Sequence, residues 1–338
     1  MKFKSLFLQI EKLLTLANVS DLKRAALTIS ERYRRLETTK DFRLYHEIER
    51  LAYIAMRMPA TVAVLDKVLK ELPAIHESLS LLDVGSGPGS VLWAASALHL
   101  KKVTCVEHER GWVDLAQKLW QGSEHQAQLK VEWVIADLAK AKLPLSDLVV
   151  ASYSLNELSE KDLEKALASL LEATGRYFVW VEPGTSESFN KMSRMRERLL
   201  LDKSLRLLAP CRSQLACPYV RWKEETQALS QAPSYAPGWC HFSARLERPS
   251  FHRLIKDVKM SYEDEKYCYL IFEKTKRDEA TPSLRLLEDP KARGGHVRLV
   301  GCNEQSEIEE LVVSKKEEDY KLARKLSWGD LWLKSSES

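Results

Sequence analysis

A buried strand that runs directly into a glycine-rich loop constrains the fold of this chain more than any other feature. Residues 79–84 are mostly apolar, and they lead into the motif DVGSGPG at 83–89. Glycines between a strand and a helix let a ligand approach the backbone, because no side chain stands in the way. The order strand, glycine loop, helix therefore predicts an α/β sheet with a ligand at the carboxyl end of its first strand.

The segments after this loop alternate between strand and helix patterns. A helix is expected to open at 91–95, and others at 112–120 and 161–171. Strands are expected at 102–107, 131–137, 147–152 and 177–182, and a late strand at 265–272. This alternation predicts a mostly parallel sheet with helices on both of its faces.

The regions that flank the sheet have different patterns. Residues 1–75 show helical spacing of apolar side chains and predict an N-terminal helical region. Residues 76–280 are expected to form one Rossmann-like domain, which is interrupted by a proline- and cysteine-rich insertion at 205–250. Residues 281–338 contain short strand patterns at 296–300 and 310–313 and predict a small β-rich appendage.

The spacing of the glycines indicates which cofactor the loop binds. A dinucleotide fingerprint needs a third small residue at position 90, where this chain has Ser90. The tighter Gly-x-Gly-x-Gly spacing after Asp83 suits S-adenosylmethionine, which has no pyrophosphate. The sequence thus predicts the fold of the class I S-adenosylmethionine-dependent methyltransferases.

Acidic residues at successive strand ends extend this predicted cofactor site. Asp83 is expected beside the amino-acid end of the cofactor, Glu107 at the ribose hydroxyls, and Asp137 with Leu138 at the adenine. Each acid alone is also compatible with a solvated strand end, but their joint placement favours a site. The predicted cofactor-binding residues are Asp83, Gly85, Ser86, Gly87, Gly89, Glu107, Asp137, Leu138 and Ser152.

The sequence assigns no catalytic residue. The segment after the fourth expected strand, 151–158, has neither an Asn/Asp-Pro-Pro-Tyr loop nor the cysteine nucleophile of cytosine-C5 enzymes. Asn156 and Glu157 either position a substrate or cap the next helix, and capping is favoured for Asn156. Methyl transfer to a good nucleophile needs mainly alignment, so enzymatic activity stays open.

Charge is distributed unevenly along the chain. The formal net charge is +4, yet residues 191–259 hold 14 Lys and Arg against 6 Asp and Glu. This segment predicts a surface that faces a polyanion, or an ordinary solvated basic surface. No apolar run is long enough to span a membrane, and the N-terminal segment does not resemble a secretory signal. Six cysteines in a chain of this length indicate a reducing compartment.

The cysteines fall into two groups. Cys105 and Cys268 lie in apolar strand patterns and are expected to fill the core. The others occur in irregular or peripheral segments, at Cys211, Cys217, Cys240 and Cys302. Their spacing is not that of a zinc ribbon, and by itself it leaves a metal site and incidental cysteines equally open. His241 is expected to be a structural, hydrogen-bonding histidine rather than a ligand.

An ordered series of short motifs supplies a family resemblance. The motifs lie at 52–61, 181–185, 209–211, 217–218, 239–242 and 264–266. In this order they resemble the methyltransferase-like family of mitochondrial small-ribosomal-subunit assembly factors and its bacterial relatives. The resemblance covers roughly residues 45–305, and the ordering of the motifs makes it specific.

The resemblance implies a class I methyltransferase fold and binding to the RNA of the small ribosomal subunit during assembly. It also implies a four-cysteine iron–sulfur cluster, carried over onto Cys211, Cys217, Cys240 and Cys302, with zinc as the alternative metal. A long insertion at 220–238 departs from the family pattern before Cys240. Phosphate contacts are expected from Arg194, Arg196, Arg198, Arg206, Arg212 and Arg221.

Three functions are compatible with these observations. The first is a methyltransferase-like, rRNA-binding factor of the small ribosomal subunit, in assembly or translation. The second is an active methyltransferase that acts on a free protein or small molecule, and the third is a non-catalytic assembly factor. We expect a monomer in the bacterial cytoplasm, or alternatively in the mitochondrial matrix, without a membrane partner.

Overall fold

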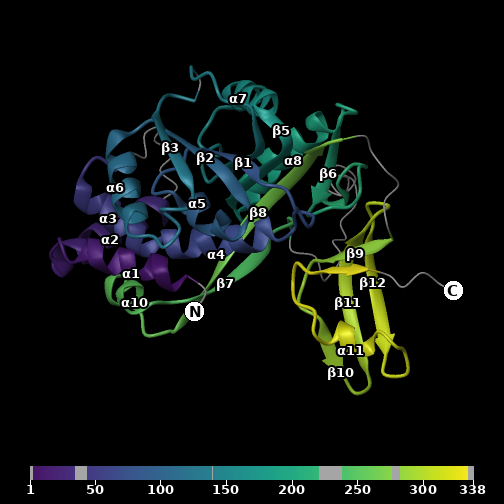
Figure 1. Ribbon diagram of the computed structural model, residues 1–338. Coiled ribbons are helices and arrows are strands. Elements are labelled where there is room, and N and C mark those ends of the chain that lie inside the picture. Colours follow the sequence, from purple (N-terminus) through teal and green to yellow (C-terminus); the bar gives the residue numbers. More distant parts are fainter. Residues whose placement is uncertain (1–2, 35–43, 139, 221–237, 276–281, 334–338) are drawn as a thin grey trace. The chain divides into compact units, whose positions relative to one another are not determined.

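The computed structural model describes residues 3–34, 44–138, 140–220, 238–275 and 282–333 (Figure 1). The chain forms two compact units. The first contains Met1–Gly175 and Ala244–Glu265, and the second contains Arg176–Ser243 and Lys266–Ser338. Within the described ranges, no helix has the length and apolar character needed to cross a membrane.

The first unit begins with helices at α1 (Lys4–Leu14), α2 (Val19–Arg34), α3 (Glu47–Met56) and α4 (Met58–Leu69). Apolar side chains at helical spacing explain their packing, and α1 buries Leu6, Ile10 and Leu13 on one face. Pro59 lies in the first turn of α4, where a missing N–H costs nothing, so the chain breaks between α3 and α4 at Arg57.

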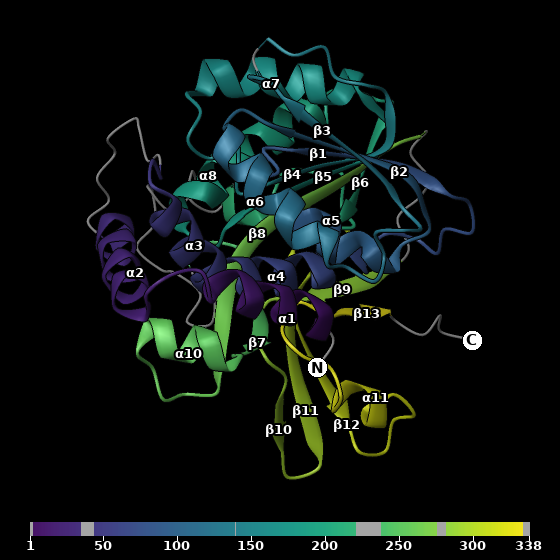
Figure 2. The ribbon, with the colours of Figure 1, turned by 60° about the vertical axis from the view of Figure 1, so that its left-hand side comes forward.

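A parallel sheet forms the centre of the first unit. Its strands β1 (Leu79–Val84), β2 (Leu100–Glu107), β3 (Lys130–Ile135) and β4 (Ser146–Ser152) have the order β3-β2-β1-β4. The helices that follow them are α5 (Ser90–Ala94), α6 (Arg110–Gln121) and α7 (Glu160–Glu172), and a 3-10 turn spans Ala95–Ala97. Figure 2 shows α7 on one side of these strands and α4 with α5 on the other.

The position of β1 determines where a ligand can bind. This strand is hydrogen-bonded to β2 on one edge and to β4 on the other. The connections after β1 and after β3 therefore leave the sheet in opposite directions, and a crevice opens at the carboxyl ends of the strands. The glycine loop follows β1 directly and lines this crevice.

Antiparallel strands characterise the second unit. Strand β8 (Tyr262–Lys274), which starts in the first unit, pairs antiparallel with β5 (Thr174–Pro183) and with β6 (Leu205–Ala209). Helix α8 (Ser186–Leu199) joins β5 to β6. Strand β7 (Phe242–Glu247) also pairs with β8, and helix α10 (Ser250–Lys256) follows β7 along the chain.

A small antiparallel sheet occupies the C-terminal part of the second unit. It contains β9 (Ser283–Leu286), β10 (Lys291–Arg293), β11 (His296–Asn303), β12 (Ile308–Ser314) and β13 (Leu331–Leu333), with a short helix α11 (Tyr320–Ala323). Leu284, Leu299 and Trp332 are buried in its own core. The predicted α/β fold with a mostly parallel sheet, N-terminal helices and a β-rich appendage is thereby confirmed.

Candidate functional site

The glycine loop of the first unit adopts backbone conformations that favour glycine. Gly85 and Gly87 have φ angles of 66° and 48°. A Cβ atom on Gly85 would lie 2.5 Å from the Cβ atom of Ser154, which is closer than two non-bonded carbon atoms can approach. A Cβ atom on Gly87 would meet no atom within 4 Å, so a side chain there would extend into open space beside the loop. The two glycines thus shape the loop for different reasons.

The crevice beside this loop has a volume of about 800 Å³. This volume is in the range of small-molecule sites. Its lining includes all the predicted cofactor residues except one: Asp83, Gly85, Ser86, Gly87, Glu107, Asp137, Leu138 and Ser152. The exception, Gly89, is the N-cap residue of α5. The structure therefore brings the sequence-predicted residues of four strand ends together in one crevice.

Asp83 is the most unusual charged group in this crevice. Its side chain is 1% exposed, and neither carboxylate oxygen has a hydrogen-bond partner among the described residues. Burial, together with the nearby Glu107, raises the pKa of Asp83 well above its usual range. Buried carboxylates without partners are rare in folded proteins, and an ammonium group bound in the crevice would supply the missing donor. The residues present thus fit the amino-acid end of S-adenosylmethionine.

Glu107 has a structural role that the sequence did not predict. Its Oε2 atom accepts a hydrogen bond from the backbone N–H of Gly87 at 2.9 Å. Its Oε1 atom accepts from the N–H groups of His108 and Glu109 at 2.8 and 3.0 Å. The carboxylate therefore joins the loop after β1 to the loop after β2, and its predicted contact with the ribose stays a prediction.

Aromatic residues that the sequence analysis did not single out complete the crevice. Tyr53 and Trp112 both line it, and their rings meet edge to face with centroids 5.4 Å apart. Tyr153, directly after β4, has a φ angle of 55°, a strained conformation for a bulky residue. The motif at 52–61 and the segment at 151–158 both contribute to this crevice, but the sequence assigned no role to Tyr53 or Tyr153.

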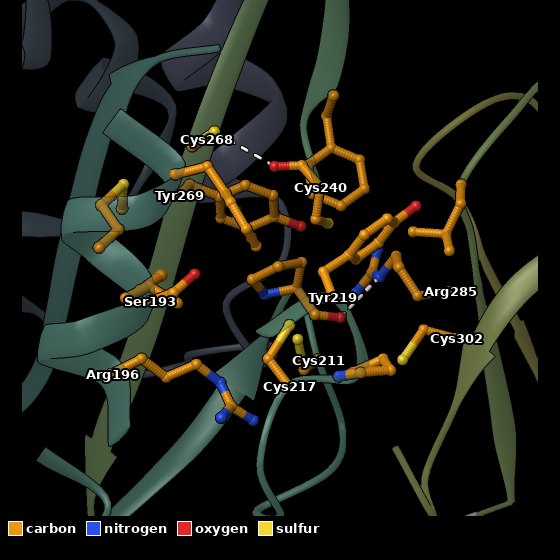
Figure 3. A pocket seen from close by; sticks show the side chains of 17 residues that line it. Ser193, Arg196, Cys211, Cys217, Tyr219, Cys240, Cys268, Tyr269, Arg285 and Cys302 are labelled. Carbon is orange, nitrogen blue, oxygen red and sulfur yellow. Dashed lines mark hydrogen bonds between the residues drawn. The ribbon is translucent and has the colours of Figure 1, made fainter. Parts of the chain in front are cut away.

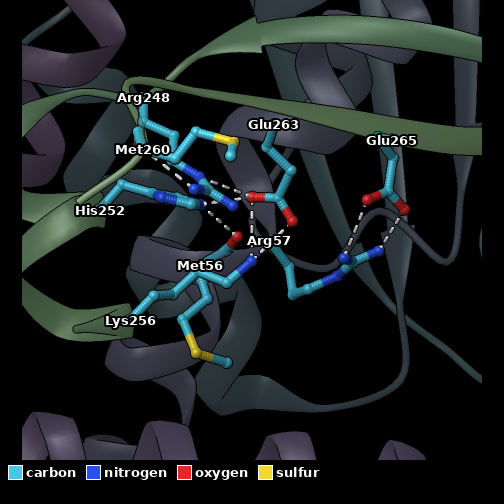
Figure 4. Close-up of polar contacts among 8 residues, drawn as sticks. All are labelled: Met56, Arg57, Arg248, His252, Lys256, Met260, Glu263 and Glu265. Atoms are coloured by element: carbon cyan, nitrogen blue, oxygen red, sulfur yellow. Dashed lines mark hydrogen bonds and ion pairs between the residues drawn. The ribbon is translucent and has the colours of Figure 1, made fainter. Parts of the chain in front are cut away.

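A network of charged residues surrounds the junction between α3 and α4 (Figure 4). Arg57 makes two parallel hydrogen bonds to Glu265, at 2.7 and 3.1 Å. His252 is fully buried, with its Nε2 atom 3.1 Å from the carbonyl oxygen of Met56 and 3.3 Å from Glu263. Burial, assisted by the positive charge of Lys256, lowers the pKa of His252 to about 4. The network fastens α10 and the start of β8 to the helices beside the crevice.

The predicted metal ligands lie together in the second unit (Figure 3). Cys211, Cys217, Cys240 and Cys302 line one cavity of about 50 Å³. This is several times the ~10–15 Å³ that one water molecule needs. They come from the loop after β6, the segment before β7 and strand β11. Within the described ranges, no three His, Cys, Asp or Glu side chains are arranged to hold a single metal ion.

The remaining two cysteines and His241 differ in position. Cys105 is fully buried in β2. Cys268 is buried in β8, but it also lines the cavity, and its Sγ atom lies 3.3 Å from the carbonyl oxygen of Cys240. His241 does not line the cavity and stacks on Trp239 with ring centroids 5.2 Å apart. The expectation for Cys268 thus covered its burial but not its place at the cavity.

The thiols around the cavity affect one another's ionisation. Burial and the neighbouring Cys211 raise the pKa of Cys217 to about 11. Burial, Cys211 and Cys217 raise the pKa of Cys240 well above its usual range. Thiolates close together in an apolar cavity repel one another, so the metal-free thiols keep their protons. A bound metal cation takes the place of these protons, and its positive charge offsets the repulsion between the thiolates. The donor set and its surroundings therefore fit a thiolate-ligated metal centre.

One predicted RNA contact, Arg196, is buried instead. Its side chain is 3% exposed, and its Nη2 atom donates to the carbonyl oxygens of Ser213 and Leu215 at 3.1 and 2.8 Å. A second arginine at the cavity, Arg285, donates to the carbonyl oxygen of Pro210 at 2.8 Å. The expected phosphate contact of Arg196 does not fit this position, because its guanidinium group is directed at the cysteine loop and away from solvent.

The other predicted RNA-contacting arginines differ in exposure. Arg194, Arg198 and Arg212 are exposed. Arg206 is 26% exposed and donates to Glu273 at 2.8 Å, so part of its charge is already balanced. Arg221 lies outside the described residues.

The chain resembles proteins of known name. Human "Ribosome assembly protein METTL17, mitochondrial" is 27% identical over 310 residues, which cover 85% of this chain and 63% of that protein. "Ribosome assembly protein RSM22, mitochondrial" of Saccharomyces cerevisiae is 25% identical over 187 residues, 40% of this chain and 30% of that protein. The chain thus spans less than two thirds of the length of these relatives. Magnesium protoporphyrin IX methyltransferase from Synechocystis PCC 6803 is a similar solved structure, with a TM-score of 0.39, 12% identity, and coverage of 73% of this chain and 94% of that chain.

A family model described as mitochondrial small ribosomal subunit Rsm22 matches residues 47–333. This match includes the glycine loop, the cysteine loop and the C-terminal sheet. Because it extends over most of the sequence, the chain belongs to the Rsm22 family.

Proposed function

We propose that this protein assists the assembly of a small ribosomal subunit by binding its rRNA, and that it carries an iron–sulfur cluster and a pocket for S-adenosylmethionine. Membership of the Rsm22 family supports the ribosomal role. The observation that carries the proposal is the grouping of Cys211, Cys217, Cys240 and Cys302 around one cavity. These cysteines come from three separate segments of the chain, and a shared metal centre would account for their convergence.

A cluster is proposed in preference to zinc because the resemblance to the assembly-factor family implies one, and four cysteine thiolates are a ligand set that iron–sulfur clusters use. Four cysteines also make a closed tetrahedral zinc site, so metal analysis distinguishes the two. When bound, such a group cross-links the cysteine loop to β11 and adds its binding free energy to folding.

The cofactor pocket has its own proposed roles. Asp83 would hold the ammonium group of S-adenosylmethionine, and the open space beside Gly87 would admit the cofactor against the backbone. The bound cofactor supplies a reactive methyl group, and binding alone is enough for a structural role in assembly. We propose no catalytic residue.

The proposed RNA contacts are made by exposed arginines. Arg194 and Arg198 lie one helical turn apart on α8, and Arg212 lies in the cysteine loop. Such residues fix position on RNA through phosphates and do not read its sequence. The proposal places the protein in a compartment that contains small subunits and keeps thiols reduced. The relatives are mitochondrial by name, which supports the mitochondrial matrix.

Anaerobic purification followed by iron, sulfide and zinc analysis tests the metal centre. We expect iron and sulfide in the wild-type protein, and reduced amounts in the Cys211→Ser, Cys217→Ser, Cys240→Ser and Cys302→Ser variants. Cys105→Ser, in the core of the first unit, is the control and should retain the metal. Protein free of iron at every step would refute the cluster, and failure to co-sediment with small subunits would refute the ribosomal role.

A further inference from the structure

We propose that Tyr219 donates a hydrogen bond from its phenolic hydroxyl to a sulfur atom of the metal centre. The inference rests on the proposed metal centre in the cysteine cavity. It adds a residue that is not a ligand but contacts the bound group, and thereby sets its redox potential and its contribution to stability.

The hydroxyl group of Tyr219 is buried without a partner. The side chain is 2% exposed, and its oxygen makes no hydrogen bond to any described residue. A buried tyrosine hydroxyl nearly always finds a partner in a folded protein. The orphaned hydroxyl therefore indicates that a group which the protein chain does not supply normally accepts its hydrogen bond.

Tyr219 lines the same cavity as the four predicted ligands (Figure 3). Its ring meets Phe189 edge to face, with centroids 6.0 Å apart, and Phe242 and Leu270 add apolar surface to the cavity. These neighbours offer no acceptor to an O–H group. A cluster bound between the cysteines would bring sulfur acceptors into the cavity that Tyr219 lines.

The main chain holds Tyr219 next to a predicted ligand. The backbone N–H of Val220 donates a hydrogen bond to the carbonyl oxygen of Cys217 at 3.0 Å, which closes a turn around Tyr219. This turn fixes the start of the Tyr219 side chain beside the cavity that Cys217 and Tyr219 both line.

The chemical consequence follows from charge. A hydrogen-bond donor stabilises a sulfur more strongly when the centre carries more negative charge, which is the reduced state of a cluster. The hydroxyl of Tyr219 therefore raises the reduction potential of the centre. In the metal-free protein the same hydroxyl has lost its acceptor and contributes nothing favourable.

The test compares Tyr219→Phe with the wild-type chain, both in the metal-free form and after anaerobic loading with iron and sulfide. The variant removes one oxygen atom and keeps the ring that packs on Phe189. We expect unchanged iron content, a more negative midpoint potential, and a smaller rise in melting temperature on loading. The metal-free variant should be as stable as the metal-free wild type, or more stable. Tyr267→Phe, a buried tyrosine of β8 that does not line the cavity, is the control and should change both forms equally.

Two outcomes separate this inference from the proposed centre. Loaded Tyr219→Phe protein with the potential and the loading-dependent stabilisation of the wild type would overturn the role of Tyr219 and leave the centre intact. Wild-type protein that takes up neither iron nor zinc would overturn both.

Discussion

The Nη2 atom of Arg196 lies 2.8 Å from the carbonyl oxygen of Leu215, so a helix residue holds the loop that carries two of the predicted ligands. The next residue on α8, Glu197, accepts a hydrogen bond from the backbone N–H of Cys217 at 3.2 Å. The two side chains also pair with each other at 2.6 Å. Helix α8 thereby orders the cysteine loop through polar contacts that need no metal.

This relationship predicts that Arg196→Met destabilises the metal-free protein. Hydrogen bonds to a charged group contribute about 1.5–3 kcal/mol each, and the variant loses those to Ser213 and Leu215. We expect a fall of about 3–6 kcal/mol in the free energy of unfolding, measured with denaturant. Arg198→Met, on an exposed position of the same helix, should change it by less than about 0.5 kcal/mol. Equal effects of the two variants would contradict the role assigned to Arg196.

The burial of Arg196 could not be predicted from the sequence. In the sequence it is one of several arginines in a basic segment, and nothing local distinguishes it from Arg194 or Arg198. Its burial depends on how α8 faces the loop after β6, which is a tertiary property. The pair of Arg57 and Glu265 is similar, because its partners lie 208 residues apart and neither belongs to a recognisable motif.

The glycine loop was accessible to prediction because its determinants are local. The strand, the glycines and the acidic residue that precedes them lie within a few positions of one another, and the carboxyl ends of parallel strands converge by geometry. The cysteines are the opposite case. Their spacing left a metal site and incidental cysteines equally open, and only the family resemblance selected four of the five that line one cavity. Cys268 was assigned to the core because its strand is apolar, a pattern that does not show which side chains border a cavity.

A second prediction concerns the orphaned carboxylate of Asp83. Replacing it by Asn should weaken the binding of S-adenosylmethionine at least about tenfold, because a charged hydrogen bond of about 1.5–3 kcal/mol is lost. Calorimetry on the folded variant measures this change. Asp137→Asn is the comparison and should weaken binding less, because the Asp137 side chain is 55% exposed and its carboxylate is better solvated. Full affinity in the Asp83→Asn protein would remove this residue from the site.

The same substitution should stabilise the protein without cofactor. The pKa of Asp83 is raised in the folded state, so between about pH 4 and that raised pKa the folded chain holds a proton that the unfolded chain has released. Wild-type stability therefore falls as the pH rises through this window, by about 1.4 kcal/mol for each unit of the shift. Asp83→Asn removes this loss, and its free energy of unfolding at pH 7 should exceed that of the wild type. A variant less stable than the wild type at neutral pH would show that other groups in the folded protein stabilise the ionised carboxylate of Asp83.

A fourth prediction follows from the buried His252. Its pKa of about 4 lies below the value of about 6.5 in an unfolded chain, so the unfolded state binds the proton first as the pH falls. Stability should fall between about pH 6.5 and pH 4, by at most about 3.4 kcal/mol from this group. Glu263 has a lowered pKa in the same network and loses its pairing with Lys256 at the acid end. His252→Gln should flatten the dependence of unfolding free energy on pH, whereas the exposed His76→Gln should not.

The last prediction addresses the proposed contact with rRNA. Neutralising Arg194, Arg198 and Arg212 together by Gln removes exposed positive charges and leaves the buried Arg196 in place. If each arginine displaces one counterion, the slope of log affinity against log salt should become shallower by about two to three. The loss of affinity should be similar for RNAs of different sequence, because phosphate contacts carry no sequence information. Filter binding across a salt series measures both quantities. Three exposed lysines outside the basic segment, at 101, 118 and 140, serve as the charge-matched control and should leave the slope unchanged when they are replaced by Gln. Parallel salt plots for the wild type and the arginine variant would show that these side chains do not contact RNA, and would leave the basic segment as an ordinary solvated surface.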